Sequence, residues 1–262
     1  MTLHTHTHLF EGAERRALAI HCTLGHSGAW RGVAAALEDD LSLLAVDLPS
    51  HGKSGVWDRT GNLHDVATDM VRGVMDGPMD LIGHSFGATV ALRIAVETPE
   101  LVRSLTMIEP VYFAAAFADK PELMEAYKSN SFALNAAFET GDEREAARVF
   151  HHDWGDGTRW EDLPARMQDH MARLVHYVPA SSAFVLHDCA GLLEGDRMAA
   201  ASMPAVVIEG DQSPPMSAEV SIALAKRLPD IERVVIKGAG HMLPLTHPES
   251  LVEPVRALLA RS

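Results

Sequence analysis

Short apolar runs alternate with amphipathic stretches in the first and last parts of the chain. Residues 41–47 form a nearly unbroken apolar run, which is typical of a strand buried on both faces of a parallel sheet. Val66, Met70 and Val74 recur every four residues, which predicts an amphipathic helix over residues 63–76. By the same criteria, strands are predicted over residues 3–10, 16–21, 41–47, 80–84, 102–108, 205–209 and 234–237. Further helices are predicted over residues 30–37, 86–98, 218–228 and 248–260, with a kink in the last at Pro254.

The alternation stops in the middle of the chain. Residues 114–202 contain helical patterns and turns but no convincing strand. Strands separated by helices on either side of this segment predict a doubly wound, mostly parallel sheet with helices on both faces. We therefore expect one α/β domain built from residues 1–113 and 203–262, interrupted by a helical insertion. In such a sheet, functional side chains gather at the carboxyl ends of the strands.

The sequence Gly-His-Ser-Phe-Gly at residues 83–87 follows an apolar run and precedes a helix-forming stretch. This strand–turn–helix context is the one in which Gly-x-Ser-x-Gly holds a nucleophilic serine on a sharp turn. Glycine is required on both sides because a side chain there would clash with the closely packed turn. The free N–H groups at the start of the following helix would then face the same place as the Ser85 hydroxyl.

Four segments together resemble the α/β-hydrolase superfamily, in that family's order. Residues 21–30 resemble its oxyanion loop, and residues 83–87 its nucleophile turn. Residues 47–54 resemble its Asp-x-Pro-Gly-His-Gly-x-Ser loop, and His241, preceded by Gly240, its histidine loop. The resemblance covers essentially the whole chain outside residues 114–202, and it implies that this insertion is a cap over the active site.

The resemblance also implies roles for individual residues. Ser85 would be the nucleophile, and His241 the base that accepts its proton and returns it to the leaving group. The backbone N–H groups of Phe86 and Thr23 would form the oxyanion hole. In the cap and beside it, three aromatic residues are candidates to line the substrate pocket: Trp154, Trp160 and Phe113.

The acid of the triad departs from the family's usual pattern. The position at which the resemblance expects an aspartate is occupied by Ser213. Two carboxylates remain as candidates, and both follow the chain order serine, acid, histidine. Glu109 ends the strand after the nucleophile's strand–helix unit, where some family members carry their acid. Asp211 follows Gly210 directly, so its side chain should leave the turn in another direction, and we prefer Glu109.

The composition and net charge of the chain limit the kinds of molecule that it could bind. The chain has 262 residues, of which 47% are hydrophobic and 22% charged, with a formal net charge of -14. Such an acidic chain is a poor ligand for nucleic acid or an anionic membrane, so a small-molecule substrate is expected. His4, His6 and His8 would share one face of a strand, but no further ligands complete a metal site, and a solvated edge strand is the preferred interpretation. No metal or cofactor is predicted.

Cysteine usage and hydropathy indicate the compartment. Cys22 and Cys189 are far apart and in no metal-ligand spacing, which favours a reducing environment. The N-terminus lacks the features of a signal peptide, and no apolar run is long enough to cross a bilayer. We therefore expect a cytoplasmic protein.

The leading functional hypothesis is a cofactor-free serine hydrolase that cleaves a small, moderately apolar ester through an acyl-enzyme. The same groups would also support hydrolysis of C–C bonds, thioesters or lactones, or acyl transfer. A hypothesis of another class is a ligand-binding protein without activity. It is favoured by Ser213 at the usual acid position and by Cys22 where the family usually has glycine.

Overall fold

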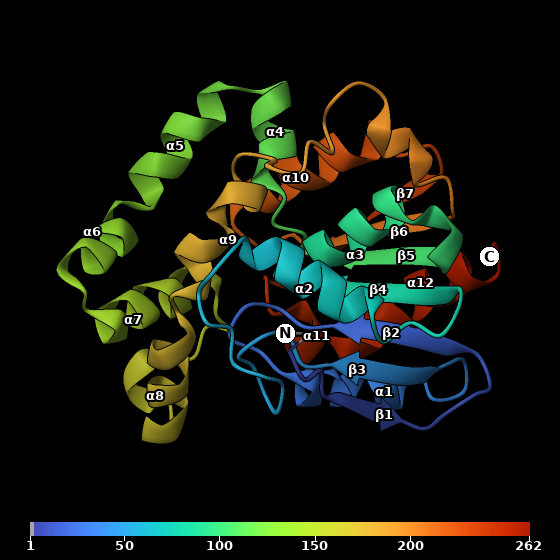
Figure 1. Cartoon of the computed structure of the whole chain (residues 1–262), viewed down its shortest axis with the longest axis horizontal. Helices are drawn as coiled ribbons and strands as arrows, with labels where there is room; N and C mark the ends of the chain where they lie inside the picture. The colour runs from blue at the N-terminus through green and yellow to red at the C-terminus, as the bar shows by residue number, and fades with distance from the viewer. Residues whose placement is uncertain (1–2) are drawn as a thin grey trace.

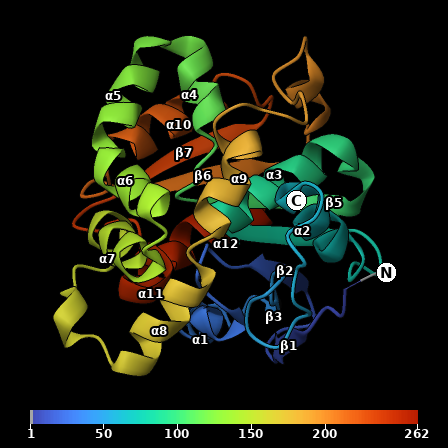
Figure 2. The same ribbon diagram turned by 60° about the vertical axis from the view of Figure 1, so that its left-hand side comes forward.

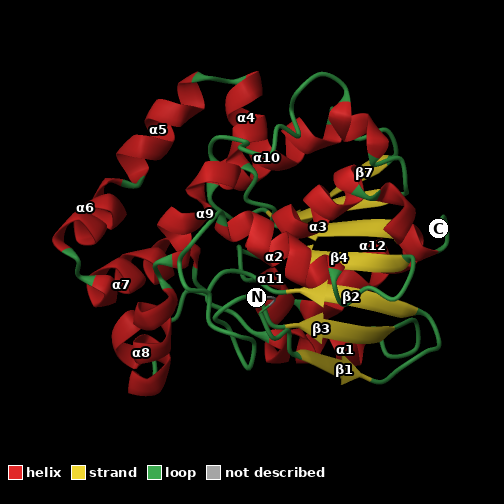
Figure 3. Ribbon diagram, in the orientation of Figure 1, coloured by secondary structure: helices red, strands yellow, loops and turns green. Residues whose placement is uncertain are grey.

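The computed structural model describes residues 3–262, and a seven-stranded sheet runs through it (Figures 1 and 3). The strand order is β1-β3-β2-β4-β5-β6-β7; β1 pairs antiparallel with β3, and all other pairs are parallel. The predicted doubly wound, mostly parallel sheet is therefore confirmed. The strands are β1 (Thr7–Phe10), β2 (Arg16–Ile20), β3 (Ser42–Val46), β4 (Met79–His84), β5 (Val102–Ile108), β6 (Ala205–Gly210) and β7 (Ile231–Ile236).

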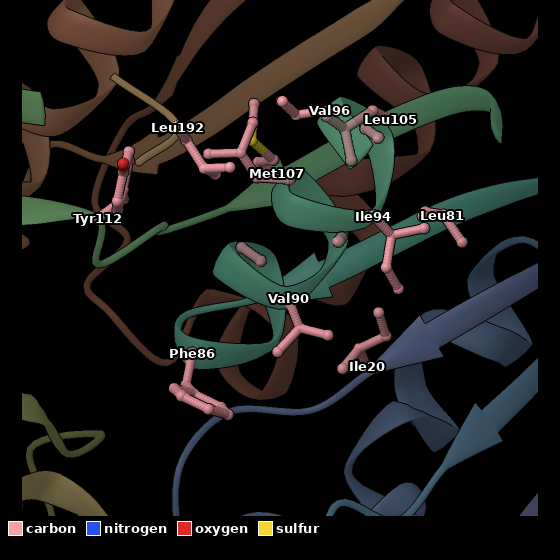
Figure 4. Close-up of a cluster of buried hydrophobic side chains, with 14 of the residues drawn as sticks. Ile20, Leu81, Phe86, Val90, Ile94, Val96, Leu105, Met107, Tyr112 and Leu192 are labelled. Atoms are coloured by element: carbon pink, nitrogen blue, oxygen red, sulfur yellow. The ribbon is translucent and has the colours of Figure 1, made fainter. Parts of the chain in front are cut away.

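Helices cover both faces of the sheet because successive residues of a strand point to opposite sides. In β2, Ala17 and Ala19 face a core formed with α1 (Arg31–Ala36) and α12 (Val252–Leu259). Leu18 and Ile20 face the opposite core, which contains the helices α2 (Leu63–Arg72), α3 (Phe86–Glu97) and α10 (Pro215–Ala225). Figure 4 shows part of this second core, where Val90 and Ile94 of α3 lie over Ile20 and Leu81 of the sheet.

Several predicted elements differ from the observed ones. The helix predicted over residues 63–76 ends at Arg72, and the helix predicted over residues 218–228 is α10, three residues earlier in the chain. The first strand is shorter than predicted, and β7 begins at Ile231 instead of residue 234. The start of β7 was missed because it contains two charged residues, Glu232 and Arg233, which an edge strand tolerates. Pro254 was wrongly predicted to kink a long helix. The 3₁₀ turn η5 (Pro248–Leu251) precedes α12 and places Pro254 in the first turn of α12, where no N–H is needed.

The insertion between β5 and β6 consists of helices, as predicted. Its helices are α4 (Phe113–Asp119), α5 (Glu122–Asn130), α6 (Phe132–Thr140), α7 (Glu143–Trp154), α8 (Ala165–Leu174) and α9 (Tyr177–Val185), with the 3₁₀ turns η3 (Trp160–Asp162) and η4 (Arg197–Ala200). Residues of α6, α7 and the end of α8 form a small apolar core of their own. Helices α5–α8 stand beyond one end of the sheet (Figure 1), and Figure 2 brings this group forward.

The histidines near the N-terminus and the two cysteines form no metal site or disulfide among the described residues. No three histidine, cysteine, aspartate or glutamate side chains in residues 3–262 are grouped in a way that could hold a metal ion. His8 instead packs edge-on against Phe10 in the antiparallel edge strand β1. Cys22 and Cys189 are both free thiols. Within the described chain, no helix has the length and apolar character needed to cross a membrane.

Candidate active site

Ser85 lies at the sharp turn between β4 and α3. Its backbone has a φ of 56° and a ψ of -118°, a strained conformation for a residue with a side chain. A Cβ added at Gly83 would lie 2.5 Å from Cα of Ala88, and one at Gly87 would lie 2.2 Å from the carbonyl oxygen of Ile20. Only glycine fits at either position. The turn is therefore built by close packing of α3 against β4 and β2, which holds the Ser85 hydroxyl at the carboxyl end of the sheet.

His241 lies in the loop that follows β7, before α11 (Leu243–Thr246). Its Nε2 atom is 3.0 Å from Oγ of Ser85, and both residues are almost buried, with exposures of 5% and 6%. The backbone carbonyl of His241 accepts a hydrogen bond of 2.8 Å from Nε2 of His84. The Trp154 ring packs edge-on against the imidazole at 4.8 Å. These contacts fix the imidazole beside the serine hydroxyl.

Glu109 follows β5 and faces the other nitrogen of His241. Its Oε2 atom lies 3.2 Å from Nδ1 of His241, and its side chain is fully buried. Oε1 accepts two hydrogen bonds of 2.6 Å, from the Gly210 N–H and the Ser213 hydroxyl. Burial alone would raise the pKa of the Glu109 carboxyl, but the bond to His241 and its charge, together with these two donors, lower this pKa to about 2.

This pairing determines the tautomer of His241. An ionised carboxylate can only accept hydrogen bonds, so Nδ1 of His241 carries the proton and donates it to Glu109. Nε2 then has a free lone pair that can accept the hydroxyl proton of Ser85. The three side chains thus form a continuous chain of hydrogen bonds from a buried anion to a hydroxyl group.

Asp211, the second candidate for the acid, does not contact His241. Its side chain is exposed and accepts hydrogen bonds from the Gly238 N–H at 2.7 Å and from the Gln212 amide at 3.1 Å. Asp211 therefore stabilises the turn after β7. Ser213, at the position where the resemblance expects the acid, instead donates its hydroxyl to Glu109.

The two amides proposed for the oxyanion hole belong to residues on the same cavity wall as Ser85 and His241. Phe86 starts α3, and Thr23 lies in the loop after β2. This loop is held by the loop that follows β3: Asp47 accepts the Ser27 N–H at 2.6 Å, and Nε2 of His51 accepts the Leu24 N–H at 3.2 Å.

Cys22 precedes Thr23 at the end of β2 and is buried. Burial raises the pKa of its thiol to about 12. The thiol is therefore protonated at neutral pH and lacks the charge that a cysteine nucleophile needs. Its sulfur packs inside the loop, where a Cβ added at Gly25 would lie 3.2 Å from it.

A cavity of about 550 Å³ opens next to Ser85. Its wall is mostly apolar, and it includes Trp154 and Phe113, two of the three aromatic residues proposed to line the substrate pocket. The third, Trp160, does not reach this cavity. It lies in η3, beyond the end of α7, where it packs against the small core of α6–α8 and lines a separate cavity with His151.

Most of the other wall residues were missed by the sequence analysis. On α5 they are Leu123, Ala126, Tyr127 and Asn130, and on α9 they are Val178, Ser181, Ser182 and Val185. Each set follows the spacing i, i+3, i+4, i+7, which marks one face of a helix. This periodicity is visible in the sequence, but it indicates only a shared face and not what that face contacts.

Comparison with known proteins agrees with the fold and the order of these elements. Residues 17–253 match the pattern of the alpha/beta hydrolase family. The chain is 25% identical to an (E)-2-((N-methylformamido)methylene)succinate hydrolase of Acinetobacter baylyi, over 96% of this chain and 93% of that protein. It is 24% identical to an esterase of Mycobacterium tuberculosis, Rv0045c, over 95% and 84% of the two chains.

Among solved structures, an alpha/beta hydrolase from Sphaerobacter thermophilus has the same fold. It superimposes with a TM-score of 0.72 at 18% identity and covers 98% of this chain and 96% of its own. The match to the family pattern spans nearly the whole chain, from β2 to α12. The chain belongs to the alpha/beta hydrolase family and is a hydrolase.

Proposed function

We propose that the chain is a serine hydrolase that cleaves small, moderately apolar esters, with Ser85, His241 and Glu109 as its catalytic triad. The observation that carries the proposal is the chain of hydrogen bonds from Glu109 through His241 to Ser85, which ends at the wall of a 550 Å³ cavity. The relative from Mycobacterium tuberculosis is named as an esterase, which supports this reaction class.

In the first half-reaction, Nε2 of His241 takes the hydroxyl proton while Oγ of Ser85 attacks the ester carbonyl carbon. The carbonyl oxygen becomes an oxyanion, which the N–H groups of Phe86 and Thr23 stabilise by hydrogen bonds. The charge that develops on His241 is balanced by Glu109, whose pKa of about 2 keeps it ionised. His241 then protonates the leaving alkoxide, and the alcohol departs from the acyl-enzyme.

In the second half-reaction, a water molecule takes the place of the alcohol. His241 removes one proton from the water, and its oxygen attacks the acyl carbon. Collapse of the second oxyanion breaks the bond to Oγ of Ser85, which regains its proton from His241. One ester and one water yield one acid and one alcohol, and the enzyme returns to its starting state.

We further propose that the helical insertion, residues 114–202, acts as the cap of this site. Faces of α5 and α9 form walls of the cavity, and Trp154 of α7 contacts the imidazole of His241. The O–H of Tyr177, at the start of α9, donates to the Pro49 carbonyl and links the insertion to the loop after β3. An apolar cover of this kind excludes water and strengthens the hydrogen bonds to the oxyanion.

Turnover of p-nitrophenyl butyrate tests the proposal. The wild-type protein should release nitrophenol, and Ser85→Ala should be inactive because it lacks the nucleophile. Ser182→Ala is a matched control, since Ser182 lines the same cavity but donates its hydroxyl to the Pro179 carbonyl instead of to a base. It should remain active. Equal activity in wild type and Ser85→Ala would contradict the proposal.

A further inference from the structure

The described wall of the cavity carries acidic side chains but no lysine or arginine. Among the described residues that line it, none is lysine or arginine, whereas two carry carboxylates, Asp153 and Glu219. The remaining wall is formed by apolar side chains, hydroxyl groups, the Asn130 amide and the His241 imidazole. A carboxylate group on a substrate would therefore lose its hydration and meet no cationic partner.

The two wall carboxylates differ in their surroundings. Glu219 of α10 accepts two hydrogen bonds from the Lys120 ammonium, at 2.6 and 2.8 Å, so its charge is balanced. Asp153, near the end of α7, makes no such ion pair within residues 3–262. Partial burial raises the pKa of its carboxyl, which the neighbouring His152 opposes. Asp153 is thus a solvent-exposed negative group on the wall with no ion-pair partner among the described residues. It is next in sequence to Trp154, whose ring touches His241.

We propose that this cavity selects uncharged or positively charged substrates and rejects those that carry a carboxylate, and that Asp153 determines this specificity. The inference rests on the proposed function, because it concerns the substrate of the same site. A substrate ammonium group would gain an ion pair with Asp153. A substrate carboxylate would be repelled by Asp153, and no cation on the wall would offset the free-energy cost of its desolvation. The relative from Acinetobacter baylyi is named for a succinate, a dicarboxylate, so the two proteins would differ in substrate class.

Three methyl esters that differ mainly in terminal charge test this proposal. They are methyl 5,5-dimethylhexanoate, its cationic counterpart methyl 4-(trimethylammonio)butyrate, and monomethyl glutarate, which carries a carboxylate. The product acids are quantified by chromatography, with Ser85→Ala as the blank. We expect kcat/KM for the cationic ester to equal or exceed that for the uncharged ester, and kcat/KM for monomethyl glutarate to be at least about thirtyfold lower.

Two variants separate the effect of Asp153 from that of net charge. Asp153→Asn should reduce the ratio of kcat/KM between the cationic and the carboxylate ester at least about fivefold, because the attraction and the repulsion are both removed. Glu139→Gln removes one negative charge from α6, but Glu139 does not line the cavity. It should leave the ratio unchanged.

The outcomes separate the two proposals. Turnover of the uncharged ester with equal or faster turnover of monomethyl glutarate would overturn the inference and leave the proposed function intact. The same ratio in Asp153→Asn and Glu139→Gln would overturn the role of Asp153. No turnover of the uncharged ester above the Ser85→Ala blank would overturn the proposed function, and with it this inference.

Discussion

At the scale of single residues, the surroundings of Glu109 explain how a carboxylate can be fully buried and still ionised. Removing a charge from water is costly unless hydrogen bonds and an opposite charge replace its hydration. Glu109 receives donors from Gly210, Ser213 and His241, so both of its oxygens are satisfied. Ser213, which stands where the resemblance expects the acid, serves as one of these donors. The change at position 213 is thus consistent with an acid that has moved to β5.

The first prediction compares the two candidate acids. Glu109→Gln keeps the shape of the side chain but removes the charge that fixes the tautomer of His241, so kcat should fall by about 10³-fold or more. Asp211→Asn should change kcat by less than about twofold, because Asp211 is exposed and its carboxylate binds the Gly238 N–H and the Gln212 amide instead of His241. Kinetics of both variants with p-nitrophenyl butyrate, with folding checked by circular dichroism, decide between them. Equal losses would contradict the triad proposed here.

At the level of helices and strands, sequence periodicity predicted most elements of the sheet domain, and the three proposed triad positions followed from their places after strands. Ser85, Glu109 and His241 each follow a parallel strand, so they meet at the side of the sheet where the carboxyl ends of the strands lie. The insertion was harder to interpret, because the contacts of a helix face depend on tertiary packing. Trp154 and Trp160 look equivalent in the sequence, yet only Trp154 lines the cavity beside Ser85.

The turn between β4 and α3 provides a prediction of stability. Gly87→Ala should lower the free energy of unfolding by about 2–3 kcal/mol, because the added Cβ would overlap the Ile20 carbonyl oxygen and force β2 and α3 apart. Gly240→Ala is the control, since its nearest new contact, the Gln212 carbonyl oxygen, is at an ordinary 3.9 Å. Urea unfolding measures both. If Gly87→Ala were as stable as the wild-type protein, the close packing described for this turn would be wrong.

At the scale of the whole molecule, buried histidines connect the site to the stability of the fold. Burial, with smaller effects of neighbouring charges, lowers the pKa of four histidines, to about 4 for His21 and about 3 for His84 and to well below the usual value for His51 and His64. His21 and His51 support the loops around the proposed oxyanion hole, and His84 binds the backbone carbonyl of His241. The site is thus built on imidazoles that must stay neutral.

These shifts predict acid sensitivity. Each of the four histidines has a lower pKa folded than unfolded, where it is about 6.5. The contribution of each histidine to the free energy of unfolding is therefore fully present above pH 6.5. It is lost as the pH falls toward the pKa of that histidine in the folded protein, at up to about 1.4 kcal/mol per pH unit. Urea unfolding at pH 7.5, 6.0 and 5.0 should show a steep loss of stability. His64→Gln, which leaves the three triad side chains unchanged, should flatten this dependence, and an unchanged slope would contradict the assignment of His64 as a buried neutral group.

Covalent labelling tests whether Ser85 is a nucleophile activated by His241, and it requires no choice of substrate. The protein is incubated with a fluorophosphonate, its intact mass is measured, and the modified peptide is sequenced, beside Ser85→Ala and His241→Ala. We predict one adduct per chain, located on Ser85 and absent from both variants. A folded wild-type protein that gains no adduct, or an adduct that persists in Ser85→Ala, would show that Ser85 is not the activated nucleophile.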